Sequence, residues 1–344
     1  MILRGGGQTA GSADQFKFAR FFQETMLKML GFVDVVIASE VLVRDGAPEP
    51  YMKLSNLLGV HGALSKTLSE IWLLFHSPPS AEVERIEREM VSLLSAKEAK
   101  AGEAIWGTME EIRTCILDSM EDSLGTPVLQ ESPDLHKATL RVMTHIKFLH
   151  RNYFSVAPIL NEVASLGKYV PRIVDASPFV SLVVEMVSCV EEKLAKRSES
   201  FTDQSLRFLF LLNNTYFIWK HLDYPTSSLN VHVATVTRKF NSYMDRYIQV
   251  SWAPMSSCLS NNPTPMCFWR NYSPLFKFES EFQKIYTTQE KWKVPDPELR
   301  KMLRGAITEK IVPVYTKYIE DNSVATLKFT PHKLEEMLKE LFEG

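Results

Sequence analysis

Histidines and paired carboxylates are the residues of this 344-residue chain whose types could support catalysis or metal binding. His145 and His150 stand five residues apart, which places them on widely separated sides of a helix and argues against a shared metal ion. Glu110 and Glu111 are adjacent, as are two further glutamate pairs at 191–192 and 335–336. Neighbouring residues diverge by about 100° on a helix, so these pairs indicate solvated surfaces rather than acid–base dyads.

Motifs for helical active sites are also missing. The sequence has no Asp-Asp dipeptide, no ExxH or HExxH and no GxSxG, which argues against all-α terpenoid synthases, di-iron bundles, zincins and nucleophile elbows. GQTAGS at 7–12 imitates a phosphate loop but contains no lysine and follows no strand. Cys258 and Cys267 form no CxxC motif and have no neighbouring histidine, so neither zinc nor a disulfide framework is expected. We predict no enzyme, catalytic residue, cofactor or metal site.

The composition is that of an ordinary folded protein, with 45% hydrophobic and 23% charged residues. A formal net charge of −2 disfavours a general nucleic-acid binder. The most apolar run, at 208–219, is about half the ~20 residues that a bilayer span requires, so no transmembrane helix is expected. Residues 1–13 have no signal-peptide core and are typical of a flexible leader.

Helical periodicity dominates the rest of the chain. Near 16–37 one face carries Phe18, Phe22, Met26, Met29, Leu30 and Val33, and residues 80–120 show one long pattern without proline. Further helices are expected near 134–167, 178–196, 202–221, 229–250, 275–291, 297–320 and 331–342, with a proline-rich loop at 251–274. The sequence predicts an all-α fold, an elongated rod of stacked antiparallel helical bundles. We expect a first helical part at 14–175, a middle bundle at 176–272 and a C-terminal bundle at 273–344.

The closing helix has a clear start signal. Thr330 is placed as an N-cap before Pro331 at the first helical position. An apolar stripe follows through Leu334, Met337, Leu338, Leu341 and Phe342. This stripe either docks on neighbouring helices or forms a membrane or partner surface. In the loop at 251–274, Met266, Phe268, Trp269 and Tyr272 likewise either anchor the loop to the helices or face a partner.

The last quarter of the chain carries an ordered set of short motifs. They are TQxxWxVPDxxLR, then ExxxPxY, then a helix ending in LFEG, formed by Thr288, Gln289, Trp292, Val294, Pro295, Asp296, Leu299, Arg300, Glu309, Pro313, Tyr315, Leu338, Leu341, Phe342, Glu343 and Gly344. This order resembles the C-terminal signature of the 70-kDa subunit family of the exocyst vesicle-tethering complex. Upstream matches are Asn213, Asn214, Tyr216 and Ile218 in one segment and His136, Thr139, Val142 and Met143 in another. The resemblance covers nearly the whole chain, is closest to plant members and lacks the family's N-terminal coil.

The resemblance implies a non-enzymatic subunit in the cytoplasm that is peripheral at the plasma membrane and secretory vesicles. Its implied partners are other exocyst subunits and Rho-type GTPases, and plant members add pathogen effectors and immune adaptors. The family contacts phosphatidylinositol 4,5-bisphosphate membranes through basic residues, for which Lys328, Lys277 and Lys333 are the candidates here. The family's lysine pair before the last helix is matched only at Lys328, with Ala325 at the other position, and its lysine-rich segment before the TQxxW helix retains only Lys277. Weak, salt-sensitive lipid binding is therefore expected. The alternative is an unrelated α-solenoid adaptor that binds proteins on a concave face.

The predicted rod can be tested by small-angle X-ray scattering. A compact globule of 344 residues would have a radius of gyration of about 20 Å. Stacked bundles should give a clearly larger value and an elongated distance distribution. A compact scattering profile would contradict this architecture.

Overall fold

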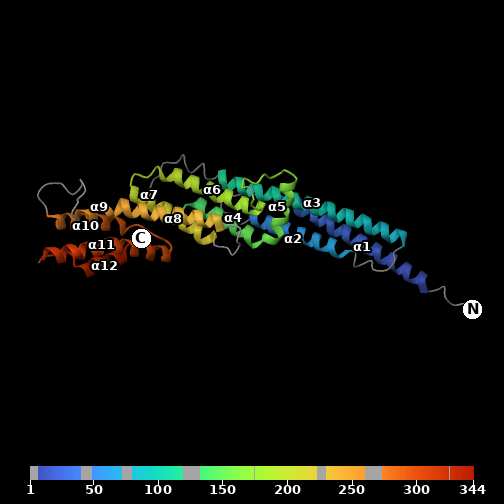
Figure 1. Cartoon of the computed structure of the whole chain (residues 1–344). Helices are drawn as coiled ribbons and strands as arrows, with labels where there is room; N and C mark the ends of the chain where they lie inside the picture. The colour runs from blue at the N-terminus through green and yellow to red at the C-terminus, as the bar shows by residue number, and fades with distance from the viewer. Residues whose placement is uncertain are drawn as a thin grey trace, which may run out of the picture. The chain divides into compact units, whose positions relative to one another are not determined.

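The computed structural model describes residues 7–39, 49–71, 80–118, 132–173, 175–222, 230–259, 273–324 and 326–344. These residues form α-helices joined by turns (Figure 1). Within the described ranges, extended chain pairs only at an isolated antiparallel bridge between Lys293 and Glu343. The predicted all-α class is therefore confirmed. The helices divide between two compact units, Met1–Asp118 with Leu149–Phe179 and Ser119–Phe148 with Val180–Gly344.

The first unit is built on one long helix. It contains α1 (Gly7–Ala38), α2 (Glu49–Glu70), α3 (Ala81–Asp118) and α5 (Tyr153–Ser165). Gln23 donates to Glu89 at 3.3 Å and Lys97 to Asp34 at 2.6 Å, so α1 runs parallel to α3. A side-chain carbon at Gly102 would lie 3.8 Å from Nε2 of His61, and Tyr51 lies near Cys115. The order of these contacts makes α2 antiparallel to α3, as the sequence predicts for neighbouring helices.

Apolar residues spaced three and four apart create the core of this unit. Leu30, Val33, Leu64, Ile86 and Leu94 are among its buried members. The single helix expected over 80–120 is confirmed as α3, and α1 begins within the stretch predicted to be a leader. The helix expected over 134–167 is instead interrupted between α4 (Lys137–Arg151) and α5 at Asn152.

The second unit contains most of α4 and its remaining helices follow in order. They are α6 (Pro178–Ser198), α7 (Gln204–Leu222), α8 (Asn230–Ser251), α9 (Ala253–Ser256), the short 3₁₀ helix η4 (Ser257–Leu259), α10 (Pro274–Gln289), α11 (Pro297–Asn322) and α12 (Pro331–Glu340). Helices α9 and η4 lie inside the stretch expected to be a loop. Cys115 and Cys189 are free thiols, whereas Cys258 is disulfide-bonded, which corrects the expectation for the cysteines.

Aromatic side chains fill the core of the C-terminal helices. Trp252, Tyr247, Tyr315, Phe278 and Phe282 are almost completely buried. The rings of Phe278 and Tyr315 stack with centroids 4.9 Å apart. Burial of one such side chain contributes about 1.5–3 kcal/mol, so this cluster is a major source of stability. The apolar stripe of the closing helix is buried in the same cluster, which confirms docking on neighbouring helices over an open surface.

The polar atoms inside this core are paired with one another. The Tyr247 hydroxyl donates to Oε1 of Gln289 at 2.5 Å, and Trp252 Nε1 donates to the Tyr247 oxygen at 3.3 Å. Burial raises the pKa of Tyr247 strongly, so this hydroxyl stays protonated and remains a donor. Each pairing avoids the cost of about 1–3 kcal/mol that an unsatisfied buried polar group incurs.

The two ends of the C-terminal sequence motif bind each other. The Val294 amide donates to the Phe342 carbonyl at 3.1 Å, and Arg304 Nε donates to the Leu341 carbonyl at 2.9 Å. Arg300 and Arg304 both pair with Glu343 and lower the pKa of its carboxyl group. Phe342 adopts a left-handed backbone with φ of 68°, an uncommon conformation for a bulky residue that the surrounding contacts must hold. The motif residues thus hold Leu341, Phe342 and Glu343 against α11 and the turn before it.

A pair of buried asparagines joins three segments of the second unit. Asn214 Oδ1 accepts from the His136 amide at 2.9 Å and from the Thr139 hydroxyl at 2.7 Å. Its Nδ2 donates to the Phe210 carbonyl at 2.9 Å. Asn213 Nδ2 donates to the Pro133 carbonyl at 2.7 Å and to the Lys293 carbonyl at 3.4 Å. The two asparagines therefore act as a structural lock that ties the segments around residues 133–139 and 293 to α7.

Substitution of Asn214 should destabilise the protein strongly. Asn214→Leu removes the side-chain acceptor Oδ1 and the donor Nδ2. The Thr139 hydroxyl and the His136 backbone amide then have no acceptor. We expect a loss of about 2–4 kcal/mol in the free energy of unfolding, since each buried group left unpaired costs about 1–3 kcal/mol. Urea denaturation measures this loss. Asn161→Leu, on the exposed face of α5, is the matched control and should change stability by less than about 0.5 kcal/mol; equal losses in the two variants would refute the lock.

Candidate functional site

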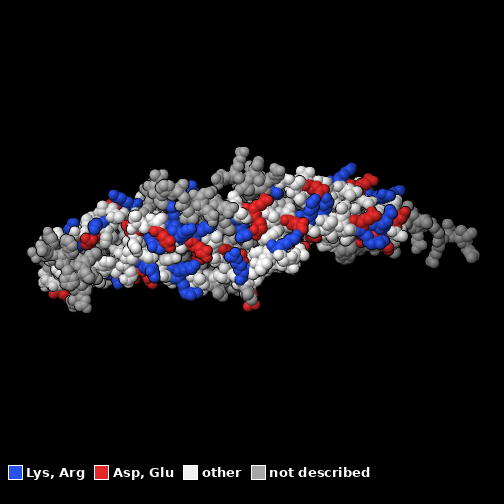
Figure 2. Space-filling model, turned by 90° about the horizontal axis from the view of Figure 1, so that it is seen from above, with Lys and Arg blue, Asp and Glu red and all other residues white. Residues whose placement is uncertain are grey.

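Two grooves on the surface of the described residues have linings suited to binding other molecules. Within the described ranges no group of three or more His, Cys, Asp or Glu side chains could hold a metal ion. No described helix is long and apolar enough to cross a membrane. On the face seen in Figure 2, Lys and Arg alternate with Asp and Glu. This face shows no large region of one charge, so binding on it must depend on local features.

The first region is a groove beside Lys328, in the turn before α12. Its volume is about 460 Å³, and Lys328, Lys284 and Phe276 contribute to its walls. Lys328 is exposed, and its Nζ lies 5.1 Å from the centroid of the Phe329 ring. Phe276 is 54% exposed. The groove therefore combines the exposed Phe276 ring, which offers apolar contact, with the positive charges of Lys328 and Lys284.

A buried carboxylate holds the turn that carries Lys328. Glu279 Oε1 accepts from the Lys328 backbone amide at 3.0 Å and lies 2.9 Å from the Tyr315 hydroxyl. The same hydroxyl lies 2.7 Å from the Phe329 carbonyl. Burial, together with the neighbouring Glu279 carboxylate, raises the pKa of Tyr315. Tyr315 therefore remains protonated, and the turn is tied to the core at two adjacent residues.

The other two predicted basic residues lie apart from this groove. Neither Lys277 nor Lys333 is among the residues that line it. Lys333 donates its backbone amide to the Thr330 cap, and its Nζ lies 3.5 Å from Glu336. Lys277 is half-buried on α10. The sequence missed Lys284, because its proximity to Lys328 depends on how the turn packs against α10 rather than on any local spacing.

The predicted partner residues of the 251–274 loop cannot be placed. Met266, Phe268, Trp269 and Tyr272 all lie outside the described residues. Their assignment as a partner surface remains a prediction.

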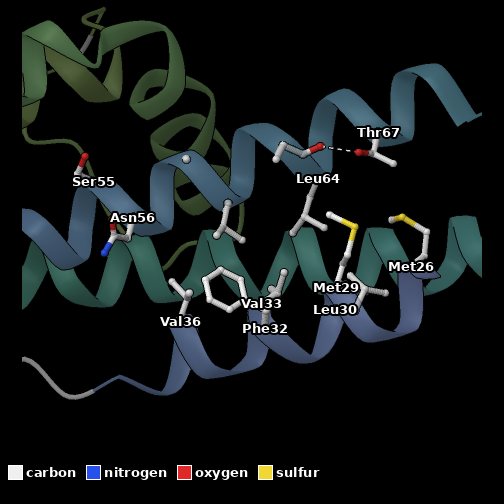
Figure 3. Close-up of a pocket in the computed structure, with 13 residues that line it drawn as sticks. Met26, Met29, Leu30, Phe32, Val33, Val36, Ser55, Asn56, Leu64 and Thr67 are labelled. Carbon is white, nitrogen blue, oxygen red and sulfur yellow. Dashed lines mark hydrogen bonds between the residues drawn. The ribbon is translucent and has the colours of Figure 1, made fainter. Parts of the chain in front are cut away.

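The second region is an apolar groove between α1 and α2. Its volume is about 690 Å³, and no charged residue lines it. Helix α1 contributes Met29 and Phe32, while α2 contributes Ser55, Gly59 and Ala63 at every fourth position (Figure 3). A side-chain carbon at Gly59 would meet nothing within 4 Å, so this wall is open to close approach by a partner backbone.

Several large side chains of α1 are exposed outside the core. Phe18 and Met29, which the sequence assigns to one core-directed face, are 46% and 59% exposed. Phe21, Phe32 and Val35 are exposed by 67%, 66% and 67%. Sequence periodicity identified the buried Leu30 and Val33 but did not show that a second apolar face lies beside them. Exposed apolar patches of this kind typically mark binding surfaces.

The fold and these surfaces describe an all-α protein with one open groove beside Lys328 and one open apolar groove. Comparison with known sequences makes the assignment specific, because the family model for the C-terminal part of the Exo70 exocyst complex subunit matches residues 8–340. The chain belongs to this family, which confirms the resemblance seen in the C-terminal motif.

Plant relatives agree with this assignment. The chain is 25% identical to the Arabidopsis thaliana exocyst component EXO70A3 over 314 residues, which cover 85% of this chain and 50% of the relative. It is 23% identical to EXO70A1 of the same plant over 353 residues, which cover 95% and 51%. The chain thus spans about half the length of these relatives. A crystal structure of S. cerevisiae Exo70p matches with 14% identity and a TM-score of 0.44, over 91% of this chain and 69% of that one.

Proposed function

We propose that this protein is a non-enzymatic subunit of the exocyst complex that helps hold secretory vesicles at the plasma membrane before fusion. The observation that carries the proposal is the family match over residues 8–340. The exposed apolar groove of α1 and α2 supports a role based on protein contacts. The protein would act in the cytoplasm, as a peripheral component of plasma membrane and vesicles.

Other exocyst subunits are the principal proposed partners. Rho-type GTPases are further candidates, and pathogen effectors and immune adaptors would connect the protein with plant defence. We propose that Met266, Phe268, Trp269 and Tyr272 contribute to a partner surface, because the sequence predicts a proline-rich loop there and three of the four side chains are aromatic.

Affinity capture from the native cell extract tests the tethering role. The protein should recover other exocyst subunits, identified by mass spectrometry. Trp269→Ala should lower that recovery without lowering the melting temperature much, since the side chain is proposed to face a partner. Phe154→Ala removes an aromatic side chain that is 91% exposed in the first unit and should leave capture unchanged. Recovery of unrelated proteins without exocyst subunits would favour the α-solenoid adaptor instead.

Contact with phosphoinositides is proposed at the Lys328 groove. Lys328 and Lys284 supply positive charge, with Lys277 and Lys333 on neighbouring surfaces. Glu281 lies 3.7 Å from Lys284, and Glu336 lies near Lys333, so the local positive charge is partly neutralised. Each basic residue near an anionic membrane contributes about 1 kcal/mol. Binding should accordingly be weak and sensitive to salt, and recruitment should depend mainly on protein partners.

Liposome sedimentation tests this contact. Vesicles with phosphatidylinositol 4,5-bisphosphate should bind the protein at low salt and lose most of it at physiological salt, because screening weakens exposed charges. Lys328→Glu should reduce binding about ten-fold or more, since it replaces a favourable charge with a repulsive one. Lys147→Glu, at an exposed position of α4, is the charge-matched control and should bind as the wild type does. Tight binding that survives raised salt, or that Lys328→Glu leaves unchanged, would overturn the proposal.

A further inference from the structure

Helix α1 carries a second apolar seam that faces away from the core of its unit. Phe18, Phe21, Thr25, Lys28, Phe32 and Val35 follow one another at alternating intervals of three and four residues. This is the spacing of the a and d positions of a coiled coil. All six side chains are exposed. The buried residues Ala19, Leu30 and Val33 of the same helix form its other face.

The order of apolar and polar residues in the seam is symmetric, with two apolar residues at each end and Thr25 and Lys28 in the middle. If two copies lie antiparallel about a two-fold axis between Met26 and Leu27, Phe18 meets Val35 of the other copy. Phe21 then meets Phe32, and Thr25 meets Lys28. A two-fold interface requires such self-complementarity, because each contact occurs twice. In this register every large apolar residue of the seam meets another apolar residue.

The charges beside the seam favour the antiparallel arrangement. Lys28 would lie opposite Thr25 of the other copy and one residue away from its Glu24. Within the described part of the chain, the ion pairs of α1 involve neither Glu24 nor Lys28. A parallel pair would instead bring the two Lys28 ammonium groups together, at a cost from like-charge repulsion. The same residue thus disfavours one orientation and stabilises the other.

We propose that α1 is a self-association element through which two copies of this chain pair antiparallel. The groove between α1 and α2 extends the contact between the two copies. Met29 and Val36 line this groove, and each directly follows a d-position residue of the seam, Lys28 or Val35. The seam from Phe18 to Val35 is only about 26 Å long at 1.5 Å per residue. Association should therefore be reversible and in the micromolar range. A dimer would carry two weak membrane-binding surfaces, whose joint affinity exceeds that of either alone.

Sedimentation velocity across about 1–200 μM tests the self-association of the 344-residue protein. The average mass should rise with concentration from 39.3 kDa toward twice that value. Phe32→Glu should keep the protein monomeric throughout, while circular dichroism shows an unchanged helix content. Phe154→Glu, at an exposed phenylalanine outside the seam, should leave dimerisation intact. A wild-type mass that stays at that of one chain would overturn the proposal.

Charge exchange tests the orientation. Glu24→Lys and Lys28→Glu, made singly, place like charges together across the seam and should each raise the dimer dissociation constant about three- to ten-fold. The double variant restores an opposite pair and should recover most of the wild-type affinity. Failure of the double variant to recover would refute the antiparallel pairing.

Engineered cysteines test the register directly. The double variant Phe18→Cys/Val35→Cys should form a covalent dimer on mild oxidation. In the proposed register, position 18 of one copy lies opposite position 35 of the other, so two cysteines meet there. Either substitution alone should give no more covalent dimer than the wild type. Equal crosslinking in a single variant would rule out this register. A lipid occupant would appear as a monomeric protein whose binding to neutral phosphatidylcholine vesicles is lost in Phe32→Glu, and this result would also overturn self-association.

Discussion

The asparagine pair of α7 is the contact on which the order of the second unit depends. Asn213 and Asn214 lie in the mostly apolar, buried middle of α7. Both of their amide nitrogens and the Asn214 oxygen hydrogen-bond inside the protein, as buried polar groups generally must. They bind segments about 80 residues away in both directions, at Pro133 and Lys293. A one-residue shift of α7 would bury these amides without partners. Apolar packing alone tolerates such shifts, whereas the asparagines permit one register.

The effect of this lock continues to the end of the chain. Lys293, whose carbonyl accepts from Asn213, is also the residue that bridges to Glu343. Glu343 in turn pairs with Arg300 and Arg304 of α11. The sequence signature near the C-terminus is therefore explained by mutual contacts among its own residues. Its role is to hold α11, α12 and the turn between them, and thereby to present Lys328 on a rigid base.

Local signals in the sequence were sufficient for most of the helices and for the starts of α11 and α12. Asp296 caps α11 by accepting from the amides of Glu298 and Leu299, and Thr330 caps α12 by accepting from that of Lys333. These are interactions within one turn of helix, which residue type and spacing specify. The break at Asn152, the partners of the asparagines and the approach of Lys284 to Lys328 depend on segments distant in sequence. No local pattern encodes which distant carbonyl or lysine will lie nearby.

The two ends of the chain show why an apolar stripe alone does not reveal function. The stripe of α12 and the outer seam of α1 both have helical spacing, yet Leu334 and Leu338 are completely buried whereas Phe21 and Phe32 are mostly exposed. The difference is geometric, because one face of α1 is already covered by α3 and a helix with apolar residues on two sides needs a second neighbour. In α12 the single stripe is satisfied within its own unit. Within the described residues, the exposed apolar face of α1 is therefore the feature that supports the proposed association, because its burial by a partner would remove apolar surface from water.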